Sequence, residues 1–309
     1  MNFQQLRSVR ETERRGFNLT EVAAALHTSQ PGVSRQVREL EEELGVTLFE
    51  RSGKRLLGLT DAGRALMPIV ERLLLGAESL RRAGEELQGR SEGRLSIAAT
   101  HSQARYALPL AVKDFRARYP NVTLHLHQGS PQQVAQMLLS GEADIGVATE
   151  ALATYDQLAT LPCYRWTHSI VVPPDHPLLL VVGQVSLRDL ARHPIITYEQ
   201  GYTGRSHIDA AFAREALVPE VVLTAMDADV IKTYVELQMG VGIVASIAID
   251  EARDTHLRAI DAGHLFEVNT TRLGIRRNHW LPGFAYNFIE TFVPTLTREV
   301  VLQAIDVSS

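Results

Sequence analysis

Cysteine is almost absent from this sequence. Cys163 is the single one among 309 residues, so no disulfide can form within the chain. Long apolar runs are also missing, because no stretch reaches the roughly 18 residues that a membrane-spanning helix needs. The first residues, MNFQQLR, lack the apolar centre of a secretion signal. These absences exclude a disulfide-stabilised secreted domain and an integral membrane protein, and they predict a cytoplasmic protein.

The sequence also lacks the motifs of the common enzyme classes. It contains no Gly-x-Ser-x-Gly turn, no P-loop and no dinucleotide-binding Gly-x-Gly-x-x-Gly. Cys163 has no companion residues for nucleophilic chemistry, and His125 and His127 have no acid or cysteine nearby in the sequence to complete a metal site. We therefore expect no enzyme, no catalytic residue, no bound metal and no cofactor.

Charge is distributed unevenly along a chain whose length predicts two or more domains. The net charge is −5, which by itself argues against a nucleic-acid partner. Residues 1–90, however, hold 14 Lys and Arg against 13 Asp and Glu, whereas the remainder holds 17 against 23. Because the local field sets the attraction to phosphates, a modestly charged N-terminal part can still bind DNA, and it would do so best as a dimer or larger assembly.

A pair of short helices is predicted near the N-terminus, after a first helix over about Phe3–Arg14. The first of the pair begins at Leu19 with Thr20 as a possible cap, and it ends at His27. Ser29 is a good N-cap for the second helix, with Pro31 in its first turn. The second helix has an apolar stripe of Val33, Val37, Leu40 and Leu44.

The face opposite that stripe carries side chains that hydrogen-bond base edges and phosphates. A basic turn between short apolar runs then predicts a hairpin over residues 46–60, which would complete a winged helix-turn-helix. The alternative is an amphipathic helix pair with solvated arginines. Because the hairpin follows at the right spacing, we predict a surface for double-stranded promoter DNA formed by Ser29, Gln30, Pro31, Ser34, Arg35, Arg38, Arg51 and Lys54. Gln30, Ser34 and Arg35 are predicted to read bases, and Arg38, Arg51 and Lys54 to bind phosphates.

A long helix is predicted to follow, capped by Thr60 and running from Asp61 to about Leu87. Its apolar residues recur at the spacing of a coiled coil, at Leu66, Val70, Leu73, Ala77, Leu80, Gly84 and Leu87. The alternative is packing within its own domain. Since so long a helix has little of a small domain to pack against, we predict that it mediates dimerisation.

After a polar, glycine-containing linker near residues 88–93, strands and helices alternate to the end of the chain, which predicts mainly parallel sheets. Several strands end in hydroxyl or amide residues where a helix begins, around Thr100, Ser130, Thr149 and Thr203. Helix N-termini and hydroxyl groups together suit a small anion. Each of these residues alone is better explained as a cap, but four converging segments would form a pocket.

Taken together, these segments resemble the LysR-type transcriptional regulators over the full length. Within that family the resemblance is to the branch that regulates sulfur assimilation, and it rests on the blocks TSQPGVSRQVR, THSQARYALP, HQGSP, ATEAL, LPCYRW, YTGRS and TAMDADVIKTYV. The resemblance implies a winged helix-turn-helix domain over residues 1–60, a linker or dimerisation helix over 61–89 and an effector domain over 90–309. The effector domain would be an α/β fold of the type II periplasmic-binding-protein kind, with one subdomain at about 93–161 and 267–309 and a second at about 162–266.

The family pattern also implies an effector site. Its positions carry over to Thr100, Ser102, Gln103, Thr149, Thr203 and Trp166. Ser102 stands where the family often has threonine. The resemblance also implies that two crossing strands, near Leu161 and Phe266, join the subdomains. The implied partners are promoter DNA, RNA polymerase and further copies of the chain in a tetramer, and the implied effector is acetylserine, sulfate or a related metabolite. Sulfonate-response regulators share most of these blocks and form the alternative. An anion solute-binding protein is a weaker one, because it leaves the winged helix unexplained.

Overall fold

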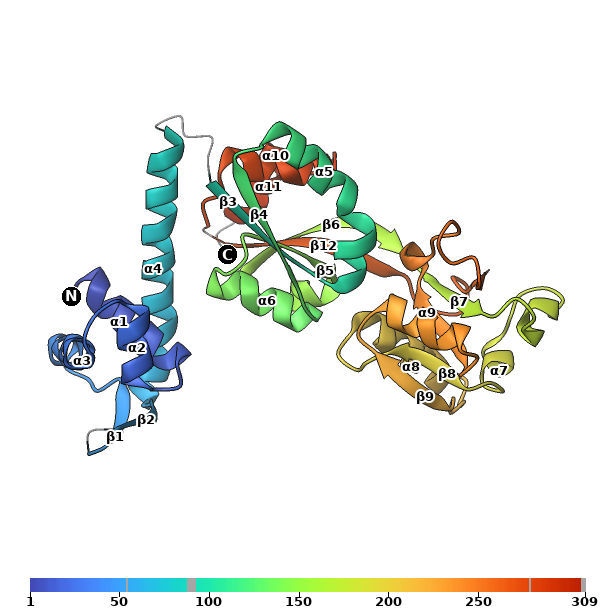
Figure 1. The fold of residues 1–309 in the computed structure, drawn as a ribbon, viewed down its shortest axis with the longest axis horizontal. Coiled ribbons are helices and arrows are strands. Elements are labelled where there is room, and N and C mark those ends of the chain that lie inside the picture. Colours follow the sequence, from blue (N-terminus) through green and yellow to red (C-terminus); the bar gives the residue numbers. More distant parts are fainter. Residues whose placement is uncertain (54, 88–92, 278, 307–309) are drawn as a thin grey trace. The chain divides into compact units, whose positions relative to one another are not determined.

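The computed structural model describes residues 1–53, 55–87, 93–277 and 279–306, except for the side chains of Thr203 and Asp306. The chain divides into two compact units, Met1–Gln88 and Gly89–Ser309. Each unit is described by itself below, and Figure 1 gives the element labels. Within the described ranges, every helix is too short or too polar to cross a membrane.

The N-terminal unit is a helical domain with a two-stranded hairpin. Its elements are α1 (Phe3–Arg14), α2 (Leu19–Ala25), α3 (Gln30–Leu44), β1 (Phe49–Ser52), β2 (Arg55–Leu59) and α4 (Asp61–Leu87). β1 and β2 pair antiparallel, with a bulge between Glu50 and Arg51. The winged helix-turn-helix architecture predicted from the sequence is therefore present.

Side-chain caps determine where these helices begin. Ser29 caps α3 as predicted, since its Oγ accepts a hydrogen bond of 3.2 Å from the backbone N–H of Gly32. The prediction of Thr20 as the cap of α2 is wrong. Asn18 caps that helix through Oδ1, which accepts from the backbone N–H of Thr20 at 3.2 Å, and Thr20 itself lies in the first turn. His27, with φ of 50°, lies just after the helix.

The core of this unit lies between α1, α2, α3 and the hairpin. Val33, Val37 and Leu40 of the predicted stripe are buried, but Leu44 at the helix end is 40% exposed. Phe3, the first residue of α1, is also exposed. Both lie at helix ends, where the apolar stripe extends beyond the neighbouring elements.

The predicted coiled-coil stripe of helix α4 has a buried part and an exposed part. Val70 is buried and Leu66 packs against the core of the N-terminal unit. Leu73, Leu80 and Leu87 are exposed instead, and Leu80 and Leu87 are the most exposed of the three at 76% and 89%. The helix thus uses its first turns to pack within the unit and presents apolar side chains farther along.

The C-terminal unit contains two five-stranded sheets. The first sheet, which we call subdomain I together with its helices, has the strand order β4-β3-β5-β12-β6. Its elements are β3 (Gly93–Ala99), the π-helical η1 (Gln103–Ala107), α5 (Pro109–Arg118), β4 (Val122–Gln128), α6 (Pro131–Ser140), β5 (Ile145–Thr149), η2 (Glu150–Thr154), β6 (Leu158–Trp166), β12 (Asn269–Arg276), α10 (Gly283–Phe292) and α11 (Arg298–Asp306).

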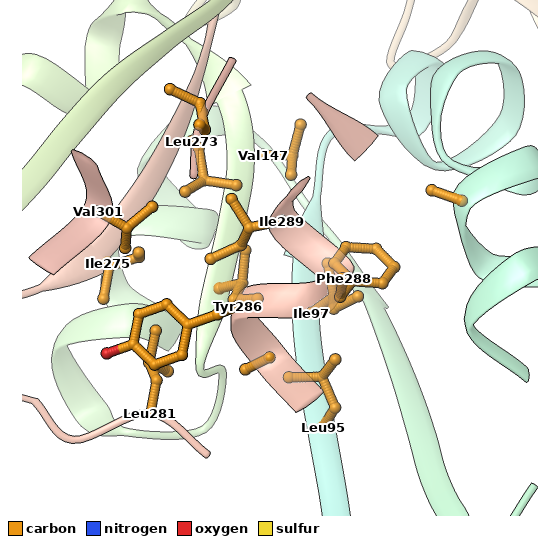
Figure 2. Packing of buried hydrophobic residues seen from close by; sticks show 14 of the residues in the cluster. Leu95, Ile97, Val147, Leu273, Ile275, Leu281, Tyr286, Phe288, Ile289 and Val301 are labelled. Carbon is orange, nitrogen blue, oxygen red and sulfur yellow. The ribbon is translucent and has the colours of Figure 1, made fainter. Parts of the chain in front are cut away.

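Helices cover both faces of this sheet. Figure 1 shows α5, α10 and α11 on one face and α6 on the other. The larger core forms beneath α5, α10 and α11, and Figure 2 shows Phe288 and Ile289 of α10 packed with Ile97, Val147 and Leu273 of three strands. Each such buried side chain contributes about 1.5–3 kcal/mol to the stability of the folded subdomain. The packed sheet therefore fixes the positions of its strand ends.

The second sheet, subdomain II with its helices, has the order β11-β7-β10-β8-β9. Its elements are β7 (His168–Val172), η3 (Pro177–Leu180), α7 (Leu187–Leu190), β8 (Ile195–Tyr198), α8 (Thr203–Arg214), β9 (Val221–Ala225), α9 (Ala228–Glu236), β10 (Val241–Ala245), η4 (Ser246–Ala248) and β11 (Arg258–Asp261). One core forms beneath α7 and α8 and another beneath α9.

Several sequence-based expectations need correction here. The sheets are mixed, because β12 pairs antiparallel with β5 and β6 and β7 pairs antiparallel with β10 and β11. Two helices, α10 and α11, follow β12 in the described residues. Leu161 lies inside β6, the strand that leads from subdomain I towards the crossing, six residues before the crossing itself. The chain crosses instead at Thr167, and it returns through the segment that contains Phe266.

Candidate functional site

The first candidate site is the exposed face of α3. Gln30, Pro31 and Arg35 are exposed there, and Ser34 is partly buried. Arg35 Nε lies 3.3 Å from Glu39 one turn later, and Arg38 donates a hydrogen bond of 3.3 Å to Ser34 Oγ. Both guanidinium groups remain at the surface. The beginning of a helix that carries amide, hydroxyl and guanidinium groups is suited to base edges in a major groove.

A groove lies beside this face, within the N-terminal unit. It is lined by the first residues of α2, by Gln30 at the start of α3 and by Arg55 to Leu57 of the hairpin. The groove places the exposed Arg55 near the residues predicted to read bases. Lys54, predicted to bind phosphate, lies outside the described residues, and its role stays a prediction.

Arg51 has a more structural position than the sequence suggested. Its Nη2 lies 2.6 Å from Oε2 of Glu41, which is only 8% exposed. The other oxygen of Glu41 accepts hydrogen bonds from the backbone N–H groups of Leu48 and Phe49, at 2.8 and 3.2 Å. Glu41 thus connects α3 to the hairpin, and Arg51 neutralises the Glu41 carboxylate. A phosphate contact of Arg51 would have to share this ion pair.

The second candidate site is a small, partly open pocket between subdomains I and II. It lies where the carboxyl ends of β3, β5 and β8 meet the starts of helices. The lining residues are Thr100, His101, Ser102, Gln103, Pro131, Thr149, Trp166, Tyr198, Tyr202, Gly204, Met226 and Ala245. All four segments that the sequence analysis singled out therefore contribute to one pocket. Hydroxyl, amide and aromatic side chains that converge at strand ends in this way form the kind of lining that holds a small ligand.

Five of the six predicted effector residues line this pocket, namely Thr100, Ser102, Gln103, Thr149 and Trp166. The sixth, Thr203, is the first residue of α8, between the lining residues Tyr202 and Gly204. Helix α8 has no side-chain cap at Tyr202. Its first N–H groups therefore depend on other partners, as helix starts that bind anions do.

Two tyrosines of the pocket were missed by the sequence analysis. Tyr198 is buried, and its hydroxyl accepts a hydrogen bond of 2.9 Å from the backbone N–H of Ala245. Burial raises the pKa of Tyr198 to about 12, so this phenol keeps its proton at neutral pH. Tyr202 stacks near Tyr198, with ring centroids 6.3 Å apart. Tyr198 ends β8 and Tyr202 directly precedes α8. Two tyrosines at either end of a loop that follows a strand were the signal that the sequence offered.

The two subdomains are also connected beside the pocket by a cluster that we call the clasp: His101, Arg105, Tyr106, Asp229 and Lys232. Asp229 Oδ2 lies 2.6 Å from Arg105 Nε and 3.3 Å from His101 Nε2, while Oδ1 accepts a 2.7 Å hydrogen bond from the Tyr106 hydroxyl. Burial opposes the charge of Asp229, but the hydrogen bonds from Tyr106 and His101 and the charges of Lys232 and Arg105 lower its pKa overall.

Beside the clasp, one nitrogen of His101 and one carboxylate oxygen each of Asp227 and Asp229 lie within 4.8 Å of one another. This spacing is compatible with a cation. Asp229 already faces Arg105 and Lys232. These positive charges disfavour a metal ion, so we interpret the group as an ion-pair network. Asp227 is also the N-cap of α9, since its side chain accepts from the backbone N–H of Val230.

The other candidates from the sequence have structural surroundings. Arg205, near the start of α8, pairs with Asp209 of the same helix at 2.7 Å. His127 Nδ1 lies 3.6 Å from Glu142 Oε1. The fold therefore brings an acid close to one of the two histidines, although none is near them in the sequence. Burial raises the pKa of Cys163 to about 12, which leaves the thiol protonated and unreactive.

Comparison with known proteins was made for both units. Residues 3–64 match the model of the bacterial regulatory helix-turn-helix proteins of the lysR family, and residues 88–296 match the LysR substrate binding domain. The chain is 56% identical to the HTH-type transcriptional regulator SsuR of Burkholderia cenocepacia, over 96% of each chain. It is 51% identical to CysB of the same organism, over 99% of this chain and 97% of the relative.

Solved structures agree with this relationship. The cofactor-binding domain of the Cbl transcriptional regulator shares 45% identity at a TM-score of 0.68, covering 71% of this chain and 96% of that one. Full-length CbnR complexed with its target DNA shares the fold at 22% identity and a TM-score of 0.63, covering 96% of this chain and all of that one. The expectation from the sequence is confirmed: this chain belongs to the LysR family of bacterial helix-turn-helix transcriptional regulators.

Proposed function

We propose that this regulator controls genes of sulfur assimilation in response to a small anionic metabolite of that pathway, such as acetylserine or sulfate. The names SsuR and CysB of its relatives support the sulfur branch, in which the sequence blocks had placed it. The alternative within the same branch is control of sulfonate or sulfate-starvation genes. Both assignments use the same two sites and differ in the target promoters and the effector.

The observation that carries the proposal is the composition of the pocket. Hydroxyl and amide groups of Thr100, Ser102, Gln103 and Thr149 meet there, and no Asp or Glu is among its lining residues. Neutral donors at helix starts bind an anion without the cost of burying a counter-charge. A carboxylate or oxyanion is therefore the ligand class that we infer.

The mechanism we infer is a shift between populations. Because the pocket walls come from both subdomains, an effector binds best when they are closed, and binding raises the closed fraction. We further propose that a homotetramer, assembled from dimers through α4, transmits this change to its DNA-binding domains and alters contacts with RNA polymerase. The proposed site of action is the cytoplasm, where promoter DNA is found.

The test combines DNA binding with effector binding. Fluorescence anisotropy with a duplex from a sulfur-gene promoter, with and without acetylserine or sulfate, should show an effector-dependent change in affinity or in the size of the complex. Thr100→Val should abolish that response and leave the basal DNA affinity intact. Thr123→Val, on the exposed side of the edge strand β4, is the matched control and should behave as wild type.

Two results would contradict the proposal. Undiminished effector binding by Thr100→Val in calorimetry would show that the pocket assignment is wrong. A wild-type protein that binds its promoter but responds to none of the sulfur metabolites would refute the sulfur assignment, while leaving the membership of the LysR family untouched.

A further inference from the structure

Gln103 is the pocket residue whose hydrogen-bonding orientation matters most, because an amide can present either a donor or an acceptor to a ligand. The side chain is 1% exposed. Its Oε1 accepts a hydrogen bond from the hydroxyl of Tyr164, a residue of β6 that does not line the pocket. With its oxygen engaged on that side, Gln103 has its Nε2 donor group left for the pocket.

Tyr164 is itself held by a neighbour on the next strand. Thr271 of β12 is the cross-strand partner of Tyr164, so the two side chains share a face of the sheet. The Thr271 hydroxyl therefore lies beside the Tyr164 side chain on this face of the sheet. Burial raises the pKa of Tyr164 to about 12, and the bonds with Thr271 and Gln103 oppose this rise. Tyr164 therefore keeps the proton that it donates.

Trp166 sets the direction of this chain of hydrogen bonds. Its Nε1–H donates to Thr271 Oγ1 at 3.1 Å, and an indole N–H can only donate. Thr271 is fully buried, so its own proton also needs an acceptor, and we infer from the cross-strand register that the neighbouring Tyr164 oxygen serves as that acceptor. The order is thus Trp166 to Thr271 to Tyr164 to Gln103, with every proton pointing along the chain toward Gln103.

We propose that Trp166, Thr271 and Tyr164 act as positioning residues that make Gln103 a hydrogen-bond donor toward the pocket, and that they thereby select ligands whose bound group only accepts hydrogen bonds. This inference deepens the proposed function and rests on it. It assigns the specificity of the site to a fully deprotonated oxyanion or carboxylate. A protonated oxyanion would direct its O–H at the N–H donor of Gln103, and a donor facing a donor leaves both unsatisfied.

Sulfate and phosphate provide a sharp comparison, because they have nearly the same size and shape. Sulfate carries no proton at neutral pH, whereas inorganic phosphate keeps at least one. The wild-type protein should therefore bind sulfate more tightly than phosphate, by roughly ten- to a hundred-fold if one buried donor is left unpaired.

The experiment is calorimetric titration of the full-length protein with sulfate and with inorganic phosphate at neutral pH. Tyr164→Phe frees the Gln103 amide to turn its oxygen into the pocket and accept from the phosphate O–H. The ratio of the two affinities should then fall by about ten-fold, chiefly because phosphate loses its disadvantage. Thr271→Val should lower the ratio in the same way, and Thr271→Ser, which retains the hydroxyl, should restore it.

Tyr119→Phe is the matched control. The Tyr119 hydroxyl also takes part in a partly buried hydrogen bond, with Asn287, in the core of subdomain I away from the pocket. This variant should keep the wild-type ratio. A merely structural role of Tyr164 would weaken both anions equally and leave the ratio unchanged.

The outcomes separate this inference from the proposed function. If wild type prefers sulfate and Tyr164→Phe and Thr271→Val keep that preference, the positioning role is refuted while the anion site stands. Equal binding of sulfate and phosphate by wild type also overturns it. If wild type binds neither anion nor acetylserine, the proposed function itself fails.

Discussion

The Tyr106 hydroxyl of subdomain I donates a hydrogen bond of 2.7 Å to Asp229 Oδ1 at the start of α9 in subdomain II. Tyr106 also accepts a hydrogen bond of 3.1 Å from Lys232, which in turn pairs with Asp254 at 2.9 Å. The clasp therefore links the helical segment that follows Thr100 to the helix that follows β9. Because these elements border the pocket, we expect the clasp and the proposed effector to stabilise the same closed arrangement.

Tyr106→Phe is expected to weaken effector binding without contacting the effector. The variant removes the hydroxyl that donates to Asp229 and accepts from Lys232. A hydrogen bond to a charged group is worth about 1.5 kcal/mol or more, and this corresponds to at least roughly ten-fold in the population of the closed form. Calorimetry with sulfate should show the dissociation constant rising by about that factor. Arg253→Ala, which removes an exposed ion pair with Asp250 in the same subdomain, is the control and should leave the affinity unchanged. Equal affinities of Tyr106→Phe and wild type would show that the clasp does not contribute to closure.

Glu41→Ala is expected to loosen the hairpin of the DNA-binding domain. It leaves the backbone N–H groups of Leu48 and Phe49 without an acceptor and Arg51 without its partner. Each buried donor left unpaired costs about 1–3 kcal/mol. Hydrogen–deuterium exchange should show the peptide over residues 46–59 exchanging at least ten-fold faster. The neighbouring Glu42→Ala, at an exposed position, should leave exchange unaltered, and similar protection in the two variants would argue against this role of Glu41.

Leu80→Glu is expected to weaken self-association through α4. Leu80 is 76% exposed within one chain, so its apolar surface is available for a second helix. If dimerisation buries it, the substitution should cost about 2 kcal/mol or more, which corresponds to at least thirty-fold in the dissociation constant. Sedimentation velocity over a concentration series measures this shift. Arg72→Ala, at an exposed polar position of the same helix, should sediment as wild type. Unchanged assembly of Leu80→Glu would exclude this part of α4 from the interface.

His168 is expected to make the C-terminal unit less stable as the pH falls. Burial, followed by the charge of the nearby His207, lowers its pKa to about 3. The unfolded chain takes up a proton near pH 6.5, and the folded chain does not until about pH 3. Between these values the unfolded state binds more protons, so the free energy of unfolding contributed by this group falls by up to about 1.4 kcal/mol per pH unit.

His168→Phe tests this dependence while retaining the edge contacts that His168 makes with Trp166 and Phe266. Urea denaturation of the C-terminal unit, followed by tryptophan fluorescence between pH 7 and pH 4, should show a shallower loss of stability for the variant. The difference should grow as the pH falls and should be small at pH 7. Parallel curves for the two proteins would mean that His168 is protonated in the folded state as readily as in the unfolded one.

Local patterns in the sequence predicted much of the fold because they report short-range physics. The cap at Ser29 and the stripe of Val33, Val37 and Leu40 each depend on residues within a few positions of one another. The same reasoning erred at Asn18 and Thr20, since both are cap-forming residue types two positions apart. It also could not show that Glu41 accepts from Leu48 and binds Arg51, because that contact requires the hairpin to fold back onto α3.

The sequence by itself determined that this protein has a DNA-reading helix pair, a long helix and strand ends rich in hydroxyl groups, because these features follow from periodicity, capping and residue chemistry along the chain. Only the tertiary structure decided which of those strand ends meet and what orients them. The Tyr106–Asp229 bond joins positions 123 residues apart, and the side chains from Trp166 to Gln103 belong to the two strands β6 and β12 and to η1. Such contacts depend on sheet order and register, which a linear pattern of residues does not encode.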